Sequence, residues 1–487
     1  MKSIFKKRNK QVEALFESAG SSNKVMCVAF DYAKAMHKCV ICDGMGHQLH
    51  KSFNVINNRE GLEFLMTKVG CLCRKHVIKF EHVFFGGEDC GSYIFNFIHA
   101  LIDRGFLVVG VNPRQAKVER ENSVASNDLI DTIGVAGTMI KMRGRTIGKS
   151  NEAVHSLKRL KRLRNALLKA HSASAHRIYQ VTDQLLPDFL NQDKSGLTPF
   201  SRASLWLMDE RFGIERMRTR QKSSMIKKMR ELNVGDPEGY TVKLKALAEE
   251  SLPPPEEMIP ALQRSLVEEK QLYSLMDKSL HNLDIDIAKQ FASTPGAMLT
   301  TIQGIGLRWA PALFVELGDP LRRRNVHSMA ALGGIVPRSK QTGGDDKQPV
   351  IRHRNRKCCT SLKKTLMSGA VSISQYGLQE MREAFKHDLE MGRDARARMA
   401  QKLLRISLHI IDVGNFFVPP SFMKECTTQQ MADYYKMMWP KVLVKWRDKG
   451  AIREATAPGA PLREWRDMAQ DLYKINLSLK SPQSGRK

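Results

Sequence analysis

The feature that most constrains the fold is a pair of short apolar runs, each of which is followed by an acid. Val25–Phe30 leads directly into Asp31, and His82–Phe85 is followed by two glycines and Glu88. Runs of this length, rich in valine and phenylalanine, are typical of strands that are buried on both faces. Two strands of this kind would each carry a carboxylate to their end.

Two further acids, Asp128 and Asp131, lie three residues apart in a segment with helical spacing that extends to Met142. Side chains at positions i and i+3 share one face of a helix. We call Asp31, Glu88, Asp128 and Asp131 the acidic tetrad. Converging carboxylates raise one another's pKa values unless a cation holds them ionised, and their hard oxygen ligands suit Mg²⁺ or Mn²⁺. The tetrad therefore predicts a metal-dependent phosphoryl-transfer site. The ordinary alternative is that each acid is a solvated surface residue.

The charge of the chain indicates a polyanionic partner. The formal net charge is +28 and the pI is about 9.8, which favours nucleic acid, although ribosomal and membrane-surface proteins share this signature. A hydrophobic share of 42% excludes wholesale disorder. No apolar core of signal-peptide length follows the basic start, and no stretch approaches ~20 uninterrupted apolar residues. We therefore expect a cytoplasmic protein with no membrane partner.

The patterns of strand and helix divide the chain into segments 1–147, 148–292, 293–430 and 431–487. In the first segment, three predicted strands form a meander, and helices and strands then alternate. This is the order expected of a ribonuclease-H-like α/β domain. The predicted strands are 25–30, 38–42, 48–54, 82–85 and 106–111, and the predicted helices are 60–69, 92–103 and 128–142.

The second segment, 148–292, carries no strand pattern and is predicted to form a long antiparallel helical arm, or coiled coil. Helices are expected at 201–232 and 259–292, and Pro253–Pro255 must interrupt any helix between them. The leucines of 157–168 form a stripe flanked by basic residues. This stripe favours either a helix that lies against a polyanion or a solvated charged face.

The mainly helical segment 293–430 contains two loops suited to DNA. Gly304-Ile305-Gly306, before a helix at 309–317, is typical of a tight interhelical turn, but in a basic setting it also favours backbone amides that hold a phosphate. In the polar loop 338–346, a hydroxyl beside paired glycines is suited to attack on a phosphodiester, although a surface loop without chemistry has the same composition. The last segment, 431–487, is a basic extension. The predicted nucleic-acid-binding residues are Gly304, Gly306, Arg322, Arg323, Arg324, Arg338, Arg352, Arg354, Arg356 and Lys357.

The order of these motifs resembles the DEDD transposases of the insertion-sequence-110 family. The resemblance covers roughly residues 25 to 375, and segment 431–487 lies outside it. The matching pieces are Asp31 with Lys34, Glu88-Asp89-Cys90-Gly91-Ser92-Tyr93, Asn112-Pro113, Asp128-x-x-Asp131, Ile302–Gly306, Leu332–Pro337, Thr342–Gly344 and the helix that includes 362–368.

The resemblance implies a recombinase that excises and inserts a mobile element, with a RuvC-like domain at 1–147 and a C-terminal transposase domain at 293–430. In such proteins the tetrad binds Mg²⁺ or Mn²⁺, and a loop serine attacks DNA to form a covalent intermediate. A structured guide RNA encoded by the element, the bridge RNA, pairs with target and donor DNA. The expected partners are thus double-stranded DNA, a guide RNA and further copies of the chain, as a dimer or tetramer, in a bacterial cytosol near the nucleoid.

The nucleophile is the main departure from the family pattern. Gln341-Thr342-Gly343-Gly344 stands where the family has a serine before the paired glycines, so Thr342 is the first candidate and Ser339 the second. Two other functions stay open. One is a catalytically degenerate nucleic-acid-binding relative, and the other is a RuvC-type junction nuclease that cuts with metal-activated water.

Overall fold

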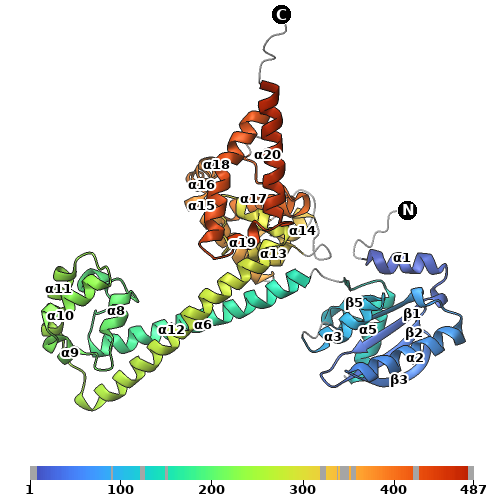
Figure 1. The fold of residues 1–487 in the computed structure, drawn as a ribbon. Helices are drawn as coiled ribbons and strands as arrows, with labels where there is room; N and C mark the ends of the chain where they lie inside the picture. Colours follow the sequence, from blue (N-terminus) through green and yellow to red (C-terminus); the bar gives the residue numbers. More distant parts are fainter. Residues whose placement is uncertain are drawn as a thin grey trace, which may run out of the picture. The chain divides into compact units, whose positions relative to one another are not determined.

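The computed structural model describes residues 8–88, 92–120, 127–148, 152–318, 325–336, 338–340, 350–352, 358–419 and 427–480. The chain divides into two compact units, which Figure 1 shows in colours that follow the sequence. The first unit comprises residues 1–152 with 319–323, and the second comprises 153–318 with 324–487. Among the described helices, none combines the length and apolar character that crossing a membrane requires.

The first unit is built on a six-stranded sheet with the order β3-β2-β1-β4-β5-β6. Strand β1 pairs antiparallel with β2 and parallel with β4, β4 pairs parallel with β5, and β3 and β6 pair antiparallel with β2 and β5. The strands are β1 Met26–Asp31, β2 Met36–Asp43, β3 Gln48–Ile56, β4 Val83–Glu88, β5 Leu107–Val111 and β6 Arg145–Ile147.

Both faces of this sheet are buried because alternate residues of β1 contribute to two separate hydrophobic clusters. Val28 and Phe30 pack into one cluster, whereas Cys27 and Ala29 pack into the other. The first cluster is completed by α2 (Arg59–His76) and α3 (Phe95–Asp103). The second is completed by α1 (Lys10–Ala19), α4 (Pro113–Val118) and α5 (Asp128–Ile140). Burial on both sides explains why the strand sequence is a continuous apolar run rather than an alternating pattern.

The predicted strands and helices of this unit are confirmed, with shifted ends. The helix predicted at 92–103 begins as a 3₁₀ turn, Ser92–Ile94, before α3, and the helix predicted at 60–69 extends to His76. The three-residue strand β6 was not predicted, because so short a segment carries no periodicity. A mixed α/β unit therefore precedes a mostly helical one.

The second unit begins with two long helices, α6 (Glu152–Leu185) and α12 (Ile259–Ala292), which run antiparallel (Figure 1). Polar contacts fix their register at several levels. The Ser156 hydroxyl donates to Gln290 Oε1 over 2.8 Å, and Arg164 pairs with Asp284. Five short helices lie between them in the sequence and pack with α6 and α12 around a separate hydrophobic cluster. They are α7 Gln192–Ser195, α8 Arg202–Leu207, α9 Ile214–Thr219, α10 Lys222–Glu231 and α11 Pro237–Glu250.

The prediction of one helix over 201–232 is wrong, because three short helices occupy this range. Gly213, with φ of +154°, lies directly before α9, and Arg220 and Gln221 have extended backbone before α10. The Asp209 carboxylate binds Arg216 and Arg220 across the break. The predicted interruption at Pro253–Pro255 is confirmed between α11 and α12.

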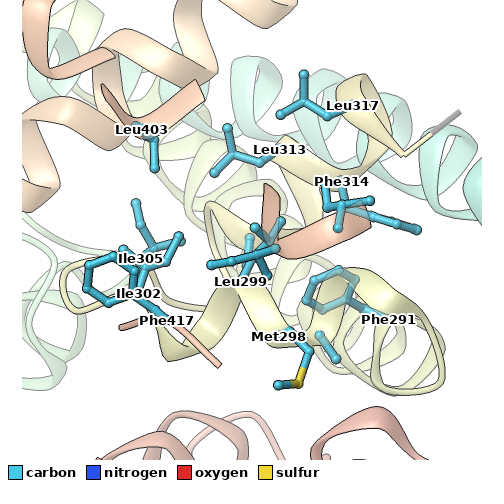
Figure 2. Close-up of a cluster of buried hydrophobic side chains, with 14 of the residues drawn as sticks. Phe291, Met298, Leu299, Ile302, Ile305, Leu313, Phe314, Leu317, Leu403 and Phe417 are labelled. Atoms are coloured by element: carbon cyan, nitrogen blue, oxygen red, sulfur yellow. The ribbon is translucent and has the colours of Figure 1, made fainter. Parts of the chain in front are cut away.

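The rest of the second unit surrounds one large hydrophobic core, part of which Figure 2 shows. Phe291 and Phe314 lie in this core, and Phe417 packs there from the segment after α17. The elements around it are the 3₁₀ segment η5 Pro295–Thr301 and α13 Ala310–Leu317, α14 Val326–Leu332, α15 Thr360–Tyr376, α16 Gln379–Glu390, α17 Ala395–Val413, α18 Thr428–Arg447, α19 Ile452–Ala455 and α20 Pro461–Lys480. Two short strands, β7 Arg338–Lys340 and β8 Val350–Arg352, pair antiparallel.

The segment predicted as a basic extension contributes to this core. Trp446 is fully buried and stacks on Phe291, with 6.0 Å between the ring centroids. Its indole nitrogen donates to Thr300 Oγ1 over 3.3 Å. Lys449 pairs with Asp284 of α12 over 3.1 Å, so α18 and the loop after it also bind the helical arm.

Candidate active site

Asp31 and Glu88 are the last residues of two neighbouring parallel strands. The pairing of β1 with β4 places Phe30 opposite Gly87, and each strand ends one residue later in its acid. Both acids are partly exposed, although the residues before them are buried. Gly87 is required here because a Cβ atom would lie 2.2 Å from the Tyr32 ring, which packs over it. The local sequence therefore brings two carboxylates to the same edge of the sheet.

The other two acids lie in the first turn of α5. Asn127 caps this helix, because its side chain accepts a hydrogen bond from the Ile130 amide over 2.9 Å. The helix packs closely on α4, since a Cβ atom at Gly134 would lie 2.6 Å from the Ala116 carbonyl oxygen. Cap and packing together fix the turn that carries Asp128 and Asp131.

The four charges act on one another. Burial raises the pKa of the Asp31 carboxyl, and the negative charges of Asp128, Glu88 and Asp131 raise it further. The positive charge of Arg120 opposes this shift. The carboxylates of the tetrad are thus close enough to influence the protonation of Asp31.

Arg120 is a component of this site that the sequence did not indicate. Its guanidinium lies 2.8 Å from Asp131 Oδ1 and 3.5 Å from Glu88 Oε1, and the side chain is only 20% exposed. Its Nε is buried without a hydrogen-bond partner. Glu119 anchors the same stretch of backbone by pairing with Lys141 and Arg143 after α5. Arg120 therefore partly neutralises two members of the tetrad.

In its chemistry the tetrad fits a hard divalent cation, because it offers only carboxylate oxygens and because Asp31 is destabilised in its charged form. The side chains do not have the spacing of a formed metal centre. Within the described ranges, no group of three or more His, Cys, Asp or Glu side chains is arranged to hold an ion. Two of the acids, Glu88 and Asp131, contact the guanidinium of Arg120.

The Gly-Ile-Gly turn of the second unit packs tightly against α15. Gly304 has φ of +83°, and a Cβ atom there would lie 2.9 Å from Ile373 Cα. The Ser372 hydroxyl donates to the Gly304 carbonyl oxygen over 2.6 Å. Gly306 is not packed in this way, because a Cβ atom there would have no other atom within 4 Å beyond its chain neighbours. The helix after the turn, α13, begins at Ala310, so the turn does not lead directly into a helix start.

A buried lysine from α18 holds the same turn. The Lys445 ammonium donates to the carbonyl oxygens of Thr300, Ile302 and Ile305 over 2.5, 3.2 and 2.9 Å. Burial lowers the pKa of Lys445 to about 8. Three carbonyls of segment 300–305, one of which belongs to the Gly-Ile-Gly turn, are thus satisfied from inside the protein rather than by solvent.

We expect Gly304→Ala to lower the free energy of unfolding of the second unit by about 1–3 kcal/mol, because alanine is strained at positive φ and would contact the α15 backbone. Urea denaturation followed by circular dichroism measures this. Gly306→Ala is the matched control and should change stability by less than about 1 kcal/mol. Equal losses in the two variants would contradict the packing role of Gly304.

Several predicted residues lie outside the described part of the chain. These are Thr342, Arg322, Arg323, Arg324, Arg354, Arg356 and Lys357. For Arg338, Ser339 and Arg352 the structure describes only the backbone, in which Arg338 pairs with Arg352 and Ser339 with Ile351.

The basic stripe of α6 is used partly within the protein. Leu157 is buried in the large core, Leu160 packs against it, and Arg164 binds Asp284. Lys161 donates to the Arg308 carbonyl oxygen over 3.5 Å. The stripe therefore packs against the rest of the second unit, which neither interpretation of its sequence had included.

Comparison with known proteins gives two family matches. A model of DEDD transposases, described as "Transposase", matches residues 28–187, and a model described as "Transposase IS116/IS110/IS902 family" matches residues 296–386. The transposase for insertion sequence element IS1328 from Yersinia enterocolitica is 27% identical over 213 residues. That alignment covers 42% of this chain and 62% of the relative, so the chain spans less than two thirds of the relative's length. The first match contains every acid of the tetrad, and the second contains the Gly-Ile-Gly turn.

Proposed function

Because the chain belongs to the IS110 family of transposases, we propose that it cuts and rejoins DNA to excise and insert a mobile element, with the acidic tetrad as its metal site. The observation that carries this proposal is the convergence of the acids, because Asp31 and Glu88 end the paired parallel strands β1 and β4 and Arg120 contacts both Glu88 and Asp131. A cluster of like charges is costly to keep unless a function requires it.

The strand order supports a ribonuclease-H-like, RuvC-like first unit. An antiparallel meander, β1 to β3, is followed by β4 and β5, which run parallel to β1. In this proposal the ends of β1 and β4 and the first turn of α5 form the active site. The sheet supplies a rigid base for acids that must be held in place.

The tetrad residues would hold Mg²⁺ or Mn²⁺, which supplies a Lewis acid that polarises a phosphoryl oxygen. The protein's own contribution is to orient the carboxylates and to offset their charge. Arg120, by binding Glu88 and Asp131, lowers the repulsion within the cluster. Asp31, next to the buried strand core, is disfavoured in its ionised form, so a nearby cation would stabilise it.

Thr342 is the proposed nucleophile, and Ser339 is the second candidate. A hydroxyl of this loop would attack a DNA phosphodiester, so that a phosphate ester to the protein forms as the bond to the departing DNA oxygen breaks. We further propose that an element-encoded guide RNA selects the DNA by base pairing. The net charge of +28 suits both nucleic acids. Two DNA sites must be cut in one event, so the active form is proposed to be an oligomer.

We expect Thr342→Ala to lower excision of the element by at least about a thousandfold, because it removes the attacking oxygen. Thr342→Ser is the matched control and should retain activity. Excision is measured with supplied element DNA and RNA, and the covalent protein–DNA adduct is mapped to a residue by mass spectrometry. An adduct on Ser339 would move the nucleophile to that residue.

Two other outcomes would replace the proposal. Cleavage that survives both Thr342→Ala and Ser339→Ala but is lost with Asp31→Asn would indicate a junction nuclease that uses activated water. Absence of cleavage by the unmodified chain, with DNA binding retained, would indicate a catalytically degenerate relative.

A further inference from the structure

We propose that an open pocket beside the Gly-Ile-Gly turn binds one unpaired base of single-stranded DNA, with Tyr376 as the stacking surface and Arg308 and Arg396 as phosphate contacts. The pocket belongs entirely to the second unit and is separate from the acidic tetrad. The inference rests on the proposed function, since it assumes that DNA is the substrate.

The pocket has the size of a small-ligand site. Its volume is about 520 Å³, which falls within the roughly 300–1,000 Å³ that such sites span. Three elements form it, namely the segment before α13, one face of α15 and the start of α17. The lining residues are Arg308, Trp309, Met367, Ser368, Val371, Ser372, Gln375, Tyr376 and Arg396.

Two aromatic side chains, together with Met367 and Val371, give the pocket its apolar surface. Trp309 packs partly against the large core and is therefore held in place. Tyr376, at the end of α15, is 72% exposed. An aromatic ring that is left open to solvent beside a pocket provides a surface on which a nucleic-acid base can stack, whatever its identity.

The charge of the pocket favours a phosphate backbone. Arg308 and Arg396 both line it, and none of its lining residues is acidic. The Arg308 guanidinium lies over the Trp309 ring, 5.1 Å from the centroid. The Lys161 ammonium holds the Arg308 carbonyl oxygen, which fixes the backbone at this position. Arginines interleaved with aromatic rings are typical of sites that bind single-stranded nucleic acid.

The polar residues of the pocket connect it to the Gly-Ile-Gly turn. Ser372 lines the pocket and also donates to the Gly304 carbonyl oxygen. Gln375 adds an exposed amide that can both donate to and accept from the edge of a base. A base in a duplex is stacked and paired and cannot enter such a pocket. DNA strand exchange supplies bases that are separated from their partners, which makes DNA the occupant to which we commit.

The test measures binding of a labelled 12-nucleotide oligo-dT to the full-length chain by fluorescence anisotropy in EDTA, where metal-dependent cleavage does not occur. We expect Tyr376→Ala to weaken binding by about tenfold, because it removes one base–aromatic stack. Tyr376→Phe should bind within about twofold of the unmodified chain. Since Tyr376 is exposed, circular dichroism should show an unchanged fold.

A second set of measurements tests the contact to the base and the contacts to the phosphates separately. An oligonucleotide with abasic positions should bind the unmodified chain and Tyr376→Ala equally, since no base is left to stack. Arg308→Ala and Arg396→Ala should each reduce the slope of log affinity against log salt by about 0.7, the value for one contact to a single strand. Arg405→Ala, an exposed arginine of α17 outside the pocket, should leave affinity unchanged.

Unchanged affinity in Tyr376→Ala, or an equal loss with the abasic oligonucleotide, would overturn the inference. Tighter, Tyr376-dependent binding of the matching RNA would overturn the assignment to DNA. The result is independent of catalysis. A chain that binds oligo-dT as described but never cuts DNA would contradict the proposed function and leave this pocket in place.

Discussion

Asp31→Asn is expected to lower DNA strand cleavage by at least about a thousandfold and, at the same time, to raise the free energy of unfolding of the metal-free protein. Cleavage is lost because an amide cannot supply the ionised oxygen that a metal site needs. Stability rises because the substitution removes a negative charge that three other carboxylates and burial disfavour. Cleavage of element DNA and thermal unfolding in EDTA measure the two effects.

The stabilisation by Asp31→Asn should depend on pH. The pKa of Asp31 is raised in the folded protein, so at neutral pH its ionised form lowers the free energy of unfolding. As the pH falls through that raised pKa, the folded protein takes up a proton before the unfolded chain does, and the penalty disappears. The difference in free energy of unfolding between Asp31→Asn and the unmodified chain should therefore become smaller as the pH approaches 3.8, the ordinary pKa of an aspartate.

Two controls distinguish the effect of a charge within the acidic tetrad from the effect of removing any surface acid. Glu17→Gln, at an exposed acid of α1 that does not belong to the tetrad, should change stability by less than about 0.5 kcal/mol and leave cleavage intact. Adding Mg²⁺ should raise the unfolding temperature of the unmodified chain more than that of Asp31→Asn. Undiminished cleavage by Asp31→Asn would contradict the place of Asp31 in the proposed site. An unfolding temperature in EDTA that is lower for this variant than for the unmodified chain would also contradict it.

Trp446→Ala should lower the free energy of unfolding of the second unit by about 3–5 kcal/mol. The indole is fully buried and stacks on Phe291, and its nitrogen donates to Thr300. Alanine would leave a cavity between α18 and the core and remove that hydrogen bond. Urea denaturation of the full chain, followed by circular dichroism, measures the loss.

Trp439→Ala is the matched control for Trp446→Ala, because Trp439 lies on the same helix but is only partly buried. Trp439→Ala should lower the free energy of unfolding by less than half as much as Trp446→Ala does. Removal of residues 431–487 should be more severe than either substitution and leave the core around Phe291 without a stable fold. A truncated chain with undiminished stability would contradict the core role of this segment.

The first unit could be predicted well from the sequence because its signals are local. The runs that became β1 and β4 are continuous and apolar, and the acids after them mark the strand ends. Arg120 could not be predicted, since its role depends on contacts with Glu88 and Asp131, which adjoin it only in the folded chain. No spacing rule connects these positions.

The second unit shows where local patterns lead to error. Segment 201–232 has helical composition throughout, yet Gly213 and the ion pairs of Asp209 divide it. Segment 431–447 mixes apolar and basic residues in a way that also suits a solvated surface helix. Its burial follows from a partner, Phe291, that lies far away in the sequence.

The hydrogen bonds from Lys445 to segment 300–305 also affect the order in which the protein can fold during synthesis. All strands of the first unit's sheet lie within residues 26–147, so this sheet can form while the ribosome is still translating the helical arm. Segment 300–305, in contrast, lacks these hydrogen bonds until Lys445 is synthesised, 140 residues after Ile305. A nascent chain interrupted before α18 would therefore carry a complete sheet, but its segment 300–305 would lack the hydrogen bonds from Lys445, which ties maturation of the second unit to translation of α18.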